Sequence, residues 1–271
     1  MVWLALIALL CWSGSDLFSK IGCRGNDKYA HLKMVIAVGI IMGIHALYEI
    51  FVGGVEVTWH VILTYLPVSL LYISSMTLGY IGLRYIELSI SSPICNSSGA
   101  LVAVLCFITG TLDDGIEGSM RLAVMGAVAL VCIGVIGLGV VESREDDELR
   151  AERQKASNYK YAKSWLALAL PVAYCLLDAA GTFADTLVLD TLAGEAEAAG
   201  LFATAEECSS YAASVSNCAY ELTFLFAAVC CIVYVGFIQK AEVCIQPGRT
   251  EILRCNLRDC WSVCFIIFAI I

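Results

Sequence analysis

Long apolar segments recur along the chain, and each is long enough to cross a lipid bilayer as a helix. A transmembrane helix takes about 20 predominantly apolar residues. Hydrophobic residues make up 60% of the 271 positions and charged residues 15%, whereas a soluble domain has about 45–50% and about 25%. The sequence therefore predicts an all-α integral membrane protein, with spans at residues 2–21, 34–52, 61–83, 88–109, 122–141, 164–189 and 220–238.

The last apolar run, residues 260–271, has about half the length of a span. A helix that stopped inside the bilayer would leave its last four carbonyl groups without partners in lipid. We therefore expect the natural chain to continue beyond Ile271, and we expect about 7–8 helices in the present sequence.

The beginning of the chain recurs after a polar stretch at residues 142–163. Asp16 lies in the first apolar segment, and Asp178 has the equivalent position in the sixth. The surrounding residues also correspond: Trp3, Leu4, Ala5 and Leu6 match Trp165, Leu166, Ala167 and Leu168, and Trp12 matches Tyr174. This pattern predicts a first five-helix repeat at 1–141, a linker at 142–163, and a second repeat at 164–271 that is truncated.

Lys and Arg residues concentrate in alternate links between the apolar segments. The links at 22–33, 142–163 and 239–259 are rich in them, whereas those at 53–60 and 190–219 have none. Because cytoplasmic loops carry an excess of Lys and Arg, this alternation places the N-terminus outside the cytoplasm. The two repeats then cross the membrane in opposite senses, and such inverted repeats are typical of transporters with a substrate site near the midplane.

Two stretches resemble the EamA-type members of the drug/metabolite transporter superfamily. In residues 10–20, Trp12 is followed by small residues, Phe18 and Lys20; in residues 80–93, an aromatic helix end leads through a tight turn to Pro93. The resemblance implies a ten-helix fold of two five-helix halves, of which the last two helices would be absent here. It also implies transport of a small metabolite or drug-like solute by alternating access, coupled to an ion or solute gradient. Many members keep the N-terminus in the cytoplasm, the reverse of what the loop charges indicate.

Asp16 and Asp178 are the leading candidates for a binding site. An ionisable group in a spanning helix costs roughly 2.5–3.5 kcal/mol on insertion scales, so it usually faces a protein interior or a water-filled cavity. There, either carboxylate could bind a cationic group or a coupling proton. The alternative is local: Asp16 pairs with Lys20 one turn on, and Asp178 hydrogen-bonds Thr182.

His45, Tyr48 and Glu49 share one helical face, which fits either a proton relay or an interfacial polar cluster. Asn96, Ser97 and Ser98 could bind a solute or join helices by hydrogen bonds. Tyr72, Ser74, Ser75 and Tyr80 could line an aromatic wall or take part in ordinary packing. We expect Tyr220 and Glu221 to lie at the interface. The complete set of candidate pathway residues is Asp16, Asp178, Trp12, Ser15, Lys20, His45, Tyr72, Asn96, Ser97 and Tyr174.

Sequence patterns for catalysis and for metal binding are missing. The chain has no Gly-x-Ser-x-Gly, no His-Glu-x-x-His and no phosphate-binding glycine loop. The net charge of -9 also argues against nucleic-acid binding. We therefore expect a transporter in the plasma membrane, with a small solute and lipid as partners and no cofactor. A membrane scaffold or sensor, or an enzyme using Asp16 and Asp178, is the alternative.

Cysteines are frequent, and most lie within or beside apolar segments. Cys208 and Cys218 fall in the predicted loop 190–218 and could form a disulfide there. Lone pairs in loops are more often free thiols, so both states are left open by the sequence.

Overall fold

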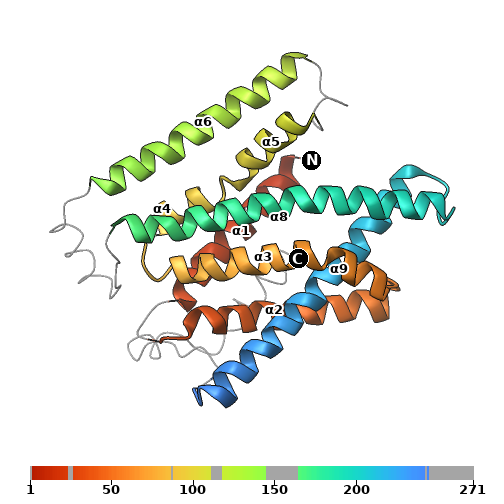
Figure 1. The fold of residues 1–271 in the computed structure, drawn as a ribbon, viewed down its shortest axis with the longest axis horizontal. Coiled ribbons are helices and arrows are strands. Elements are labelled where there is room, and N and C mark those ends of the chain that lie inside the picture. Colours follow the sequence, from red (N-terminus) through yellow and green to blue (C-terminus); the bar gives the residue numbers. More distant parts are fainter. Residues whose placement is uncertain are drawn as a thin grey trace. The chain divides into compact units, whose positions relative to one another are not determined.

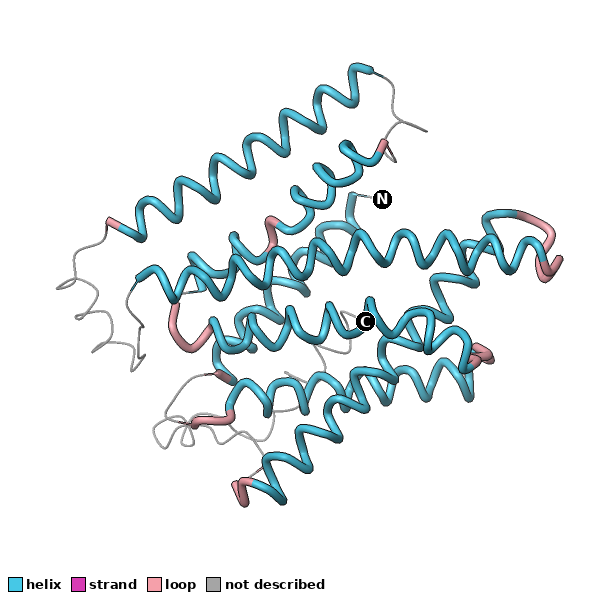
Figure 2. The backbone as a smooth tube through the Cα atoms, in the orientation of Figure 1, coloured by secondary structure: helices cyan, strands magenta, loops and turns pink. Residues whose placement is uncertain are grey.

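The structure is a computed structural model that describes residues 2–23, 27–86, 88–110, 118–144, 164–241 and 243. Within these ranges the chain forms helices and no strand (Figure 2). The elements, labelled in Figure 1, are α1 (Val2–Gly22), α2 (Ala30–Tyr48), η1 (Glu49–Gly53), α3 (Trp59–Gly82), α4 (Leu88–Cys95), α5 (Ser98–Thr109), α6 (Gly118–Ser143), α8 (Ser164–Ala198), α9 (Ala205–Ile232) and η2 (Val233–Ile238).

Six helical segments are long and apolar enough to cross a membrane, which makes the chain a multi-pass membrane protein. They are Ala30–Gly53, Trp59–Gly82, Ile90–Thr109, Arg121–Val141, Leu168–Ala198 and Ala205–Ile238. α1 forms the helix predicted at residues 2–21 but is not one of these six. The predicted all-α membrane fold is therefore confirmed, while the inverted repeat stays a prediction. The apolar run 260–271 lies outside the described residues.

The segment predicted as a loop at residues 190–218 is helical over most of its length, so that prediction was wrong. α8 continues to Ala198 and α9 begins at Ala205. Ala and Glu, which dominate this segment, are strong helix formers. At the start of α9, the Thr204 side chain accepts a hydrogen bond from the Glu207 backbone N–H, and the Glu207 side chain accepts one from the Thr204 backbone N–H. This capping box defines the N-terminus of α9.

Because this segment is helical, Cys208 and Cys218 do not form the disulfide that the sequence left open. Both side chains are buried on α9, and both are free thiols. Ten residues along one continuous helix separate their Cα atoms by about 15 Å, more than twice the roughly 4.4–6.8 Å that a disulfide requires. No bond between them is compatible with this helix.

The chain divides into two compact units. Unit 1 consists of Met1–Ile73 and Thr186–Ile271, and unit 2 consists of Ser74–Asp185. The boundary therefore divides two helices. α3 belongs to unit 1 up to Ile73 and to unit 2 from Ser74, and α8 belongs to unit 2 up to Asp185 and to unit 1 from Thr186. The predicted boundary at the linker 142–163 lies mostly outside the described residues, and the repeats it would separate remain a prediction.

In unit 1, α2 packs closely against α9, and the two ribbons cross in Figure 1. A Cβ atom at Gly39 would lie 2.6 Å from the backbone oxygen of Phe224 and 2.7 Å from Cβ of Ala228. At Gly43 it would lie 2.7 Å from the Leu225 side chain. Small residues at these positions let the two backbones approach, which is how helices associate in lipid.

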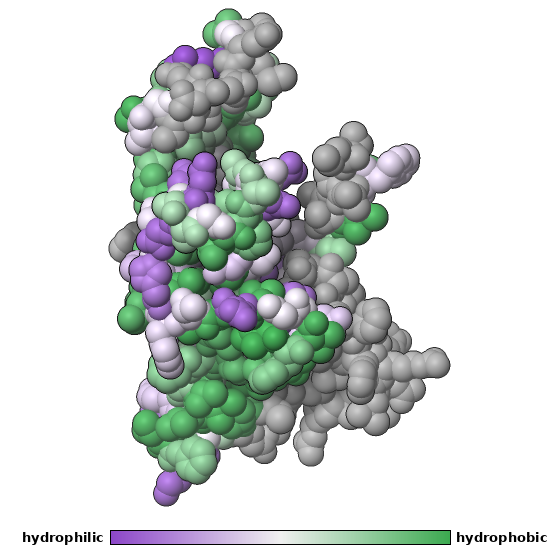
Figure 3. Space-filling model, turned by 90° about the vertical axis from the view of Figure 1, so that its right-hand side faces the viewer, coloured by the Kyte–Doolittle hydropathy of each residue, from purple (hydrophilic) through white to green (hydrophobic). Residues whose placement is uncertain are grey.

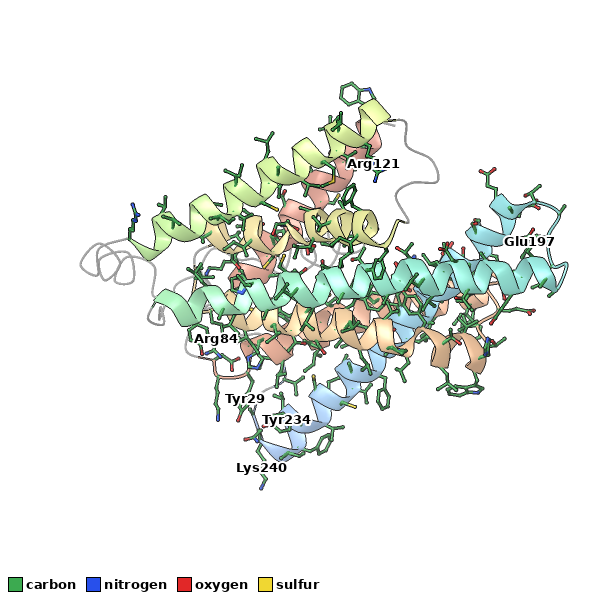
Figure 4. The ribbon with its side chains drawn as sticks, turned by 45° about the horizontal axis from the view of Figure 1, so that its top comes forward. Tyr29, Arg84, Arg121, Glu197, Tyr234 and Lys240 are labelled. Carbon is green, nitrogen blue, oxygen red and sulfur yellow. The ribbon has the colours of Figure 1, made fainter. Side chains whose placement is uncertain are left out.

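The ends of α2 and η2 in unit 1 also meet through polar aromatic contacts. The Tyr29 hydroxyl donates a 2.7 Å hydrogen bond to Gln239 Oε1, and the Gln239 amide donates one of 3.1 Å to the Tyr234 hydroxyl. The rings of Tyr29 and Tyr234 are 6.3 Å apart and lie edge to face (Figure 4). Amphipathic aromatic side chains of this kind are typical of membrane–water interfaces.

In unit 2, α8 packs against the end of α3, while α6 packs against α4 and α5. A Cβ atom at Gly79 would lie 2.9 Å from the Tyr174 ring, and one at Gly82 would contact Leu170. The other face of α6 exposes Leu122, Leu130 and Ile133 at 76%, 71% and 66%. Figure 3 shows patches of hydrophobic residues beside hydrophilic ones on the face that it displays. Exposed apolar faces of this extent are suited to contact with lipid.

Candidate functional site

The candidate site in unit 2 begins at an interruption in a membrane span. The predicted helix at residues 88–109 is broken into α4 and α5 at Asn96 and Ser97. Pro93 inside α4 lacks a backbone N–H and therefore weakens helical hydrogen bonding there. The break is stabilised locally, since Ser97 Oγ donates a 2.6 Å hydrogen bond to the Ile94 carbonyl and the Asn96 amide donates one of 2.9 Å to the Ser92 carbonyl.

Asp178 on α8 lies at this break. Its carboxylate accepts hydrogen bonds from the side chains of Ser98, the first residue of α5, and Ser75 on α3. Ser75 is fully buried and Ser98 is 9% exposed, whereas Asp178 itself is half-buried. Three helices that are separate in the sequence therefore converge on one carboxylate.

A second contact joins the same helices one turn before Asp178. Ser97 Oγ lies 3.3 Å from Cys175 Sγ, and both side chains are buried. Tyr174 packs against Gly79 on α3. We call the group Asp178, Ser75, Ser98, Ser97 and Cys175 the Asp178 site.

The Asp178 site lies well inside the membrane-spanning region. Spans cross the membrane alternately, so the end of α3 at Gly82, the start of the next span at Ile90, and the start of the α8 span at Leu168 share one side. With a rise of 1.5 Å per residue, Ser75, Ser98 and Asp178 lie about 10–15 Å from these ends. A hydrocarbon core is about 30 Å thick, so each of the three residues lies near the middle of its candidate span.

The charge of Asp178 is not neutralised by another side chain of the described residues. No ion pair involves it, and its only side-chain partners there are the two serine hydroxyls. The N-terminus of α5 adds a partial positive charge beside it, which favours an anionic side chain. The site thus holds a carboxylate by neutral donors and leaves its negative charge available to a bound cation or proton.

Thr182, the local partner considered for Asp178, contacts its backbone. Its hydroxyl donates a 3.0 Å hydrogen bond to the backbone carbonyl of Asp178. Ser98 was predicted as a polar group of the fourth segment and Ser75 as part of a wall on the third, but neither was predicted to hold the Asp178 carboxylate. The small-residue stretch around Ser98 was visible in the sequence, but no sequence signal pairs it with Ser75.

Unit 1 contains a second ionisable group, Glu221, which was predicted at the membrane interface and is instead buried in the protein. Glu221 lies within α9, not at the start of a span, and it is completely buried. Both of its carboxylate oxygens lie close to His45 Nδ1 on α2, at 2.9 and 3.0 Å. His45 Nε2 lies 3.8 Å from Glu49 Oε1. The predicted His45 cluster therefore extends into the protein interior.

The remaining candidates lie in unit 1. On α1, Lys20 is buried, Asp16 and Ser15 are half-buried, and Trp12 is 50% exposed. The Tyr72 ring is 5.6 Å from that of Tyr220. Asp16 belongs to unit 1 and Asp178 to unit 2, so their joint role in one pathway stays a prediction.

Neither a metal site among the described residues nor a match to a known family adds to the functional assignment. Among the described residues, no group of three or more His, Cys, Asp and Glu side chains is placed to hold a metal ion. No family model matches the chain, and no curated protein or solved structure matches it either. The likeness to EamA-type transporters therefore rests on residues 10–20 and 80–93 alone.

Proposed function

We propose that the chain is a membrane transporter for a small solute, and that the Asp178 site binds the solute or a coupling proton. The observation that carries the proposal is a carboxylate near the middle of the membrane, with no counter-ion among the described residues, at an interrupted span. Interrupted helices near the midplane are where transporters bind their substrates. A static structural protein gains nothing from a charge that is costly in lipid.

The chemistry of the Asp178 site defines the class of solute. One carboxylate with two hydroxyl donors matches a protonated amine, which supplies both a positive charge and hydrogen-bond donors. Ser97 and Cys175 provide additional weakly polar atoms beside it. The preferred solute is therefore a small amine-bearing metabolite or drug-like cation, with a proton as the alternative occupant.

The transport cycle we propose is alternating access between two five-helix halves in the plasma membrane, as in EamA-type transporters. The break between α4 and α5 supports this cycle, because a short loop inside a span can change its backbone angles without breaking a continuous helix. The recurrence of the Asp16 segment around Asp178 supports the repeat.

Counterflow in liposomes tests transport directly. The purified full chain is reconstituted with a high internal concentration of each unlabelled solute from a panel of primary amines, amino acids and quaternary ammonium compounds. We expect at least one labelled solute to enter faster than into protein-free liposomes, and only when the same solute is inside. Uptake equal to that of protein-free liposomes for the whole panel, with the protein shown to be folded, would refute transport of amine-bearing solutes.

A further inference from the structure

Three ionisable side chains in unit 1 form a continuous series that the Asp178 site does not use. Glu221 on α9 contacts His45 on α2 through Nδ1, at 2.9 and 3.0 Å from the two carboxylate oxygens. The opposite ring nitrogen, Nε2, faces Glu49 at 3.8 Å. The imidazole therefore stands between two carboxylates, with one nitrogen toward each.

Exposure rises in steps along this series. The side chains of Glu221, His45 and Glu49 are 1%, 19% and 34% exposed. Glu49 begins η1, the π-helical end of the first long span, and its carboxylate lies against Gly53, where a Cβ atom would be 2.6 Å from Oε2. π-Helical turns are rare and occur often at functional sites. The series thus connects a fully buried carboxylate to the accessible end of α2.

Other titratable groups lie around the series but do not interrupt it. Cys218 on α9 is buried close enough to both Glu221 and Glu49 to interact electrostatically with them. Tyr220, the neighbour of Glu221 on α9, contacts the Tyr72 ring of α3. His31 and Lys33 are the other basic residues of α2, and both lie more than three turns from His45.

We propose that Glu49, His45 and Glu221 form a proton-transfer chain that loads and unloads Glu221 from the Gly53 end of α2. In the inward step, protonated Glu49 gives its proton to Nε2 of neutral His45, and Nδ1–H of the same ring gives its proton to the Glu221 carboxylate. One O–H and one N–H bond break, one N–H and one O–H bond form, and no other reactant is needed. The reverse step returns the proton.

The geometry fits transfer better than a fixed ion pair. An ionised carboxylate only accepts hydrogen bonds, so His45 Nδ1 carries a hydrogen that both Glu221 oxygens can share. The gap of 3.8 Å to Glu49 is longer than a direct hydrogen bond, and one water molecule or a small rotation of Glu49 bridges such a distance. A purely structural pair would need neither Glu49 nor access to solvent.

Infrared difference spectroscopy of the full chain in lipid, without any solute, tests this inference independently of transport. On acidification, wild-type protein should gain a carboxylic-acid carbonyl band that is missing in Glu221→Gln. Glu221→Asp, which keeps a carboxylate, should shift this band. This shift assigns the band to residue 221 if Glu221→Gln does not fold. After a rapid pH jump, the band should form about tenfold or more slowly in Glu49→Gln.

Glu56→Gln is the matched control, because Glu56 is an exposed carboxylate just beyond the same span. Its band should form at the wild-type rate. The inference is overturned if the acid band is the same in Glu221→Gln and wild type, or if Glu49→Gln and Glu56→Gln form it at equal rates. The first result would leave Glu221 as a static partner of His45, and the second would remove Glu49 from the path.

Discussion

Ser97 Oγ lies 3.3 Å from Cys175 Sγ, which joins the break between α4 and α5 to α8 one turn before Asp178. Residues 97 and 98 therefore face α8 from the same short turn. Ser98 holds the Asp178 carboxylate, and Ser97 contacts the preceding helical turn. The break is thus linked to the carboxylate through Ser98 and to the preceding turn of α8 through Ser97.

Removing the hydroxyl groups around Asp178 should weaken the site without abolishing the fold. Polar contacts between membrane helices contribute about 0.5–2 kcal/mol each, so Ser75→Ala and Ser98→Ala should each lower the free energy of unfolding by that amount. Ser74→Ala is the control, because Ser74 is exposed and adjacent to Ser75. Equal unfolding curves for Ser74→Ala and Ser75→Ala in detergent would show that the hydrogen bond to Asp178 contributes nothing.

Close packing of α2 and α9 makes Gly39 sensitive to a single methyl group. Its Cβ atom would lie 2.6 Å from a backbone oxygen, which cannot rotate away. Overpacking of this kind costs about 1–3 kcal/mol, so Gly39→Ala should lower the unfolding temperature. Gly134→Ala on α6 has no atom within 4 Å of the new Cβ and should be neutral or slightly stabilising. Equal unfolding temperatures for the two variants would contradict the close approach.

The His45–Glu221 pair should show strong energetic coupling. Removing one partner of a buried hydrogen-bonded pair costs about 1–3 kcal/mol, and more when the remaining group is charged, whereas replacing both is often nearly neutral. His45→Leu and Glu221→Leu should therefore each destabilise the protein more than the double variant does. The measurement is a double-mutant cycle of unfolding in detergent. Additive losses would mean that the 2.9 Å contact carries no coupling.

Cys208 and Cys218 should both be reduced in the folded protein. Alkylation with iodoacetamide after unfolding, without a reductant, should modify both peptides completely, because a helix holds the two thiols about 15 Å apart. Prior reduction should not increase the yield. A peptide pair that is alkylated only after reduction would require α9 to be broken between these residues.

Helix type and approximate length were predictable from the sequence, because they follow from apolar runs alone. The spans around Ala30–Gly53, Trp59–Gly82 and Arg121–Val141 agree with the predicted segments within a few residues. The loop predicted at 190–218 failed because polar composition was taken to indicate a loop. Ala and Glu both favour helices, and the Thr204–Glu207 cap provides a start signal.

Positions of the charged groups were predictable, but their partners were not. Asp178 and His45 stand out as ionisable residues inside apolar runs, which needs only the sequence. Ser75 contacts Asp178 and Glu221 contacts His45 only because helices that are distant in the chain pack together. A one-dimensional pattern contains no information on which face of α3 or α9 turns toward these groups.

The Asp178 site is tested most directly by comparing solute flux through wild-type, Asp178→Asn and Asp190→Asn protein in liposomes. Asp190 is an exposed carboxylate on the same helix, so the two variants differ only in position. Charge-assisted hydrogen bonds contribute about 1.5–3 kcal/mol, so Asp178→Asn should reduce saturable counterflow about tenfold or more. Asp190→Asn should retain wild-type flux. Undiminished flux in folded Asp178→Asn protein would contradict the role of Asp178 in binding the solute or its coupling proton.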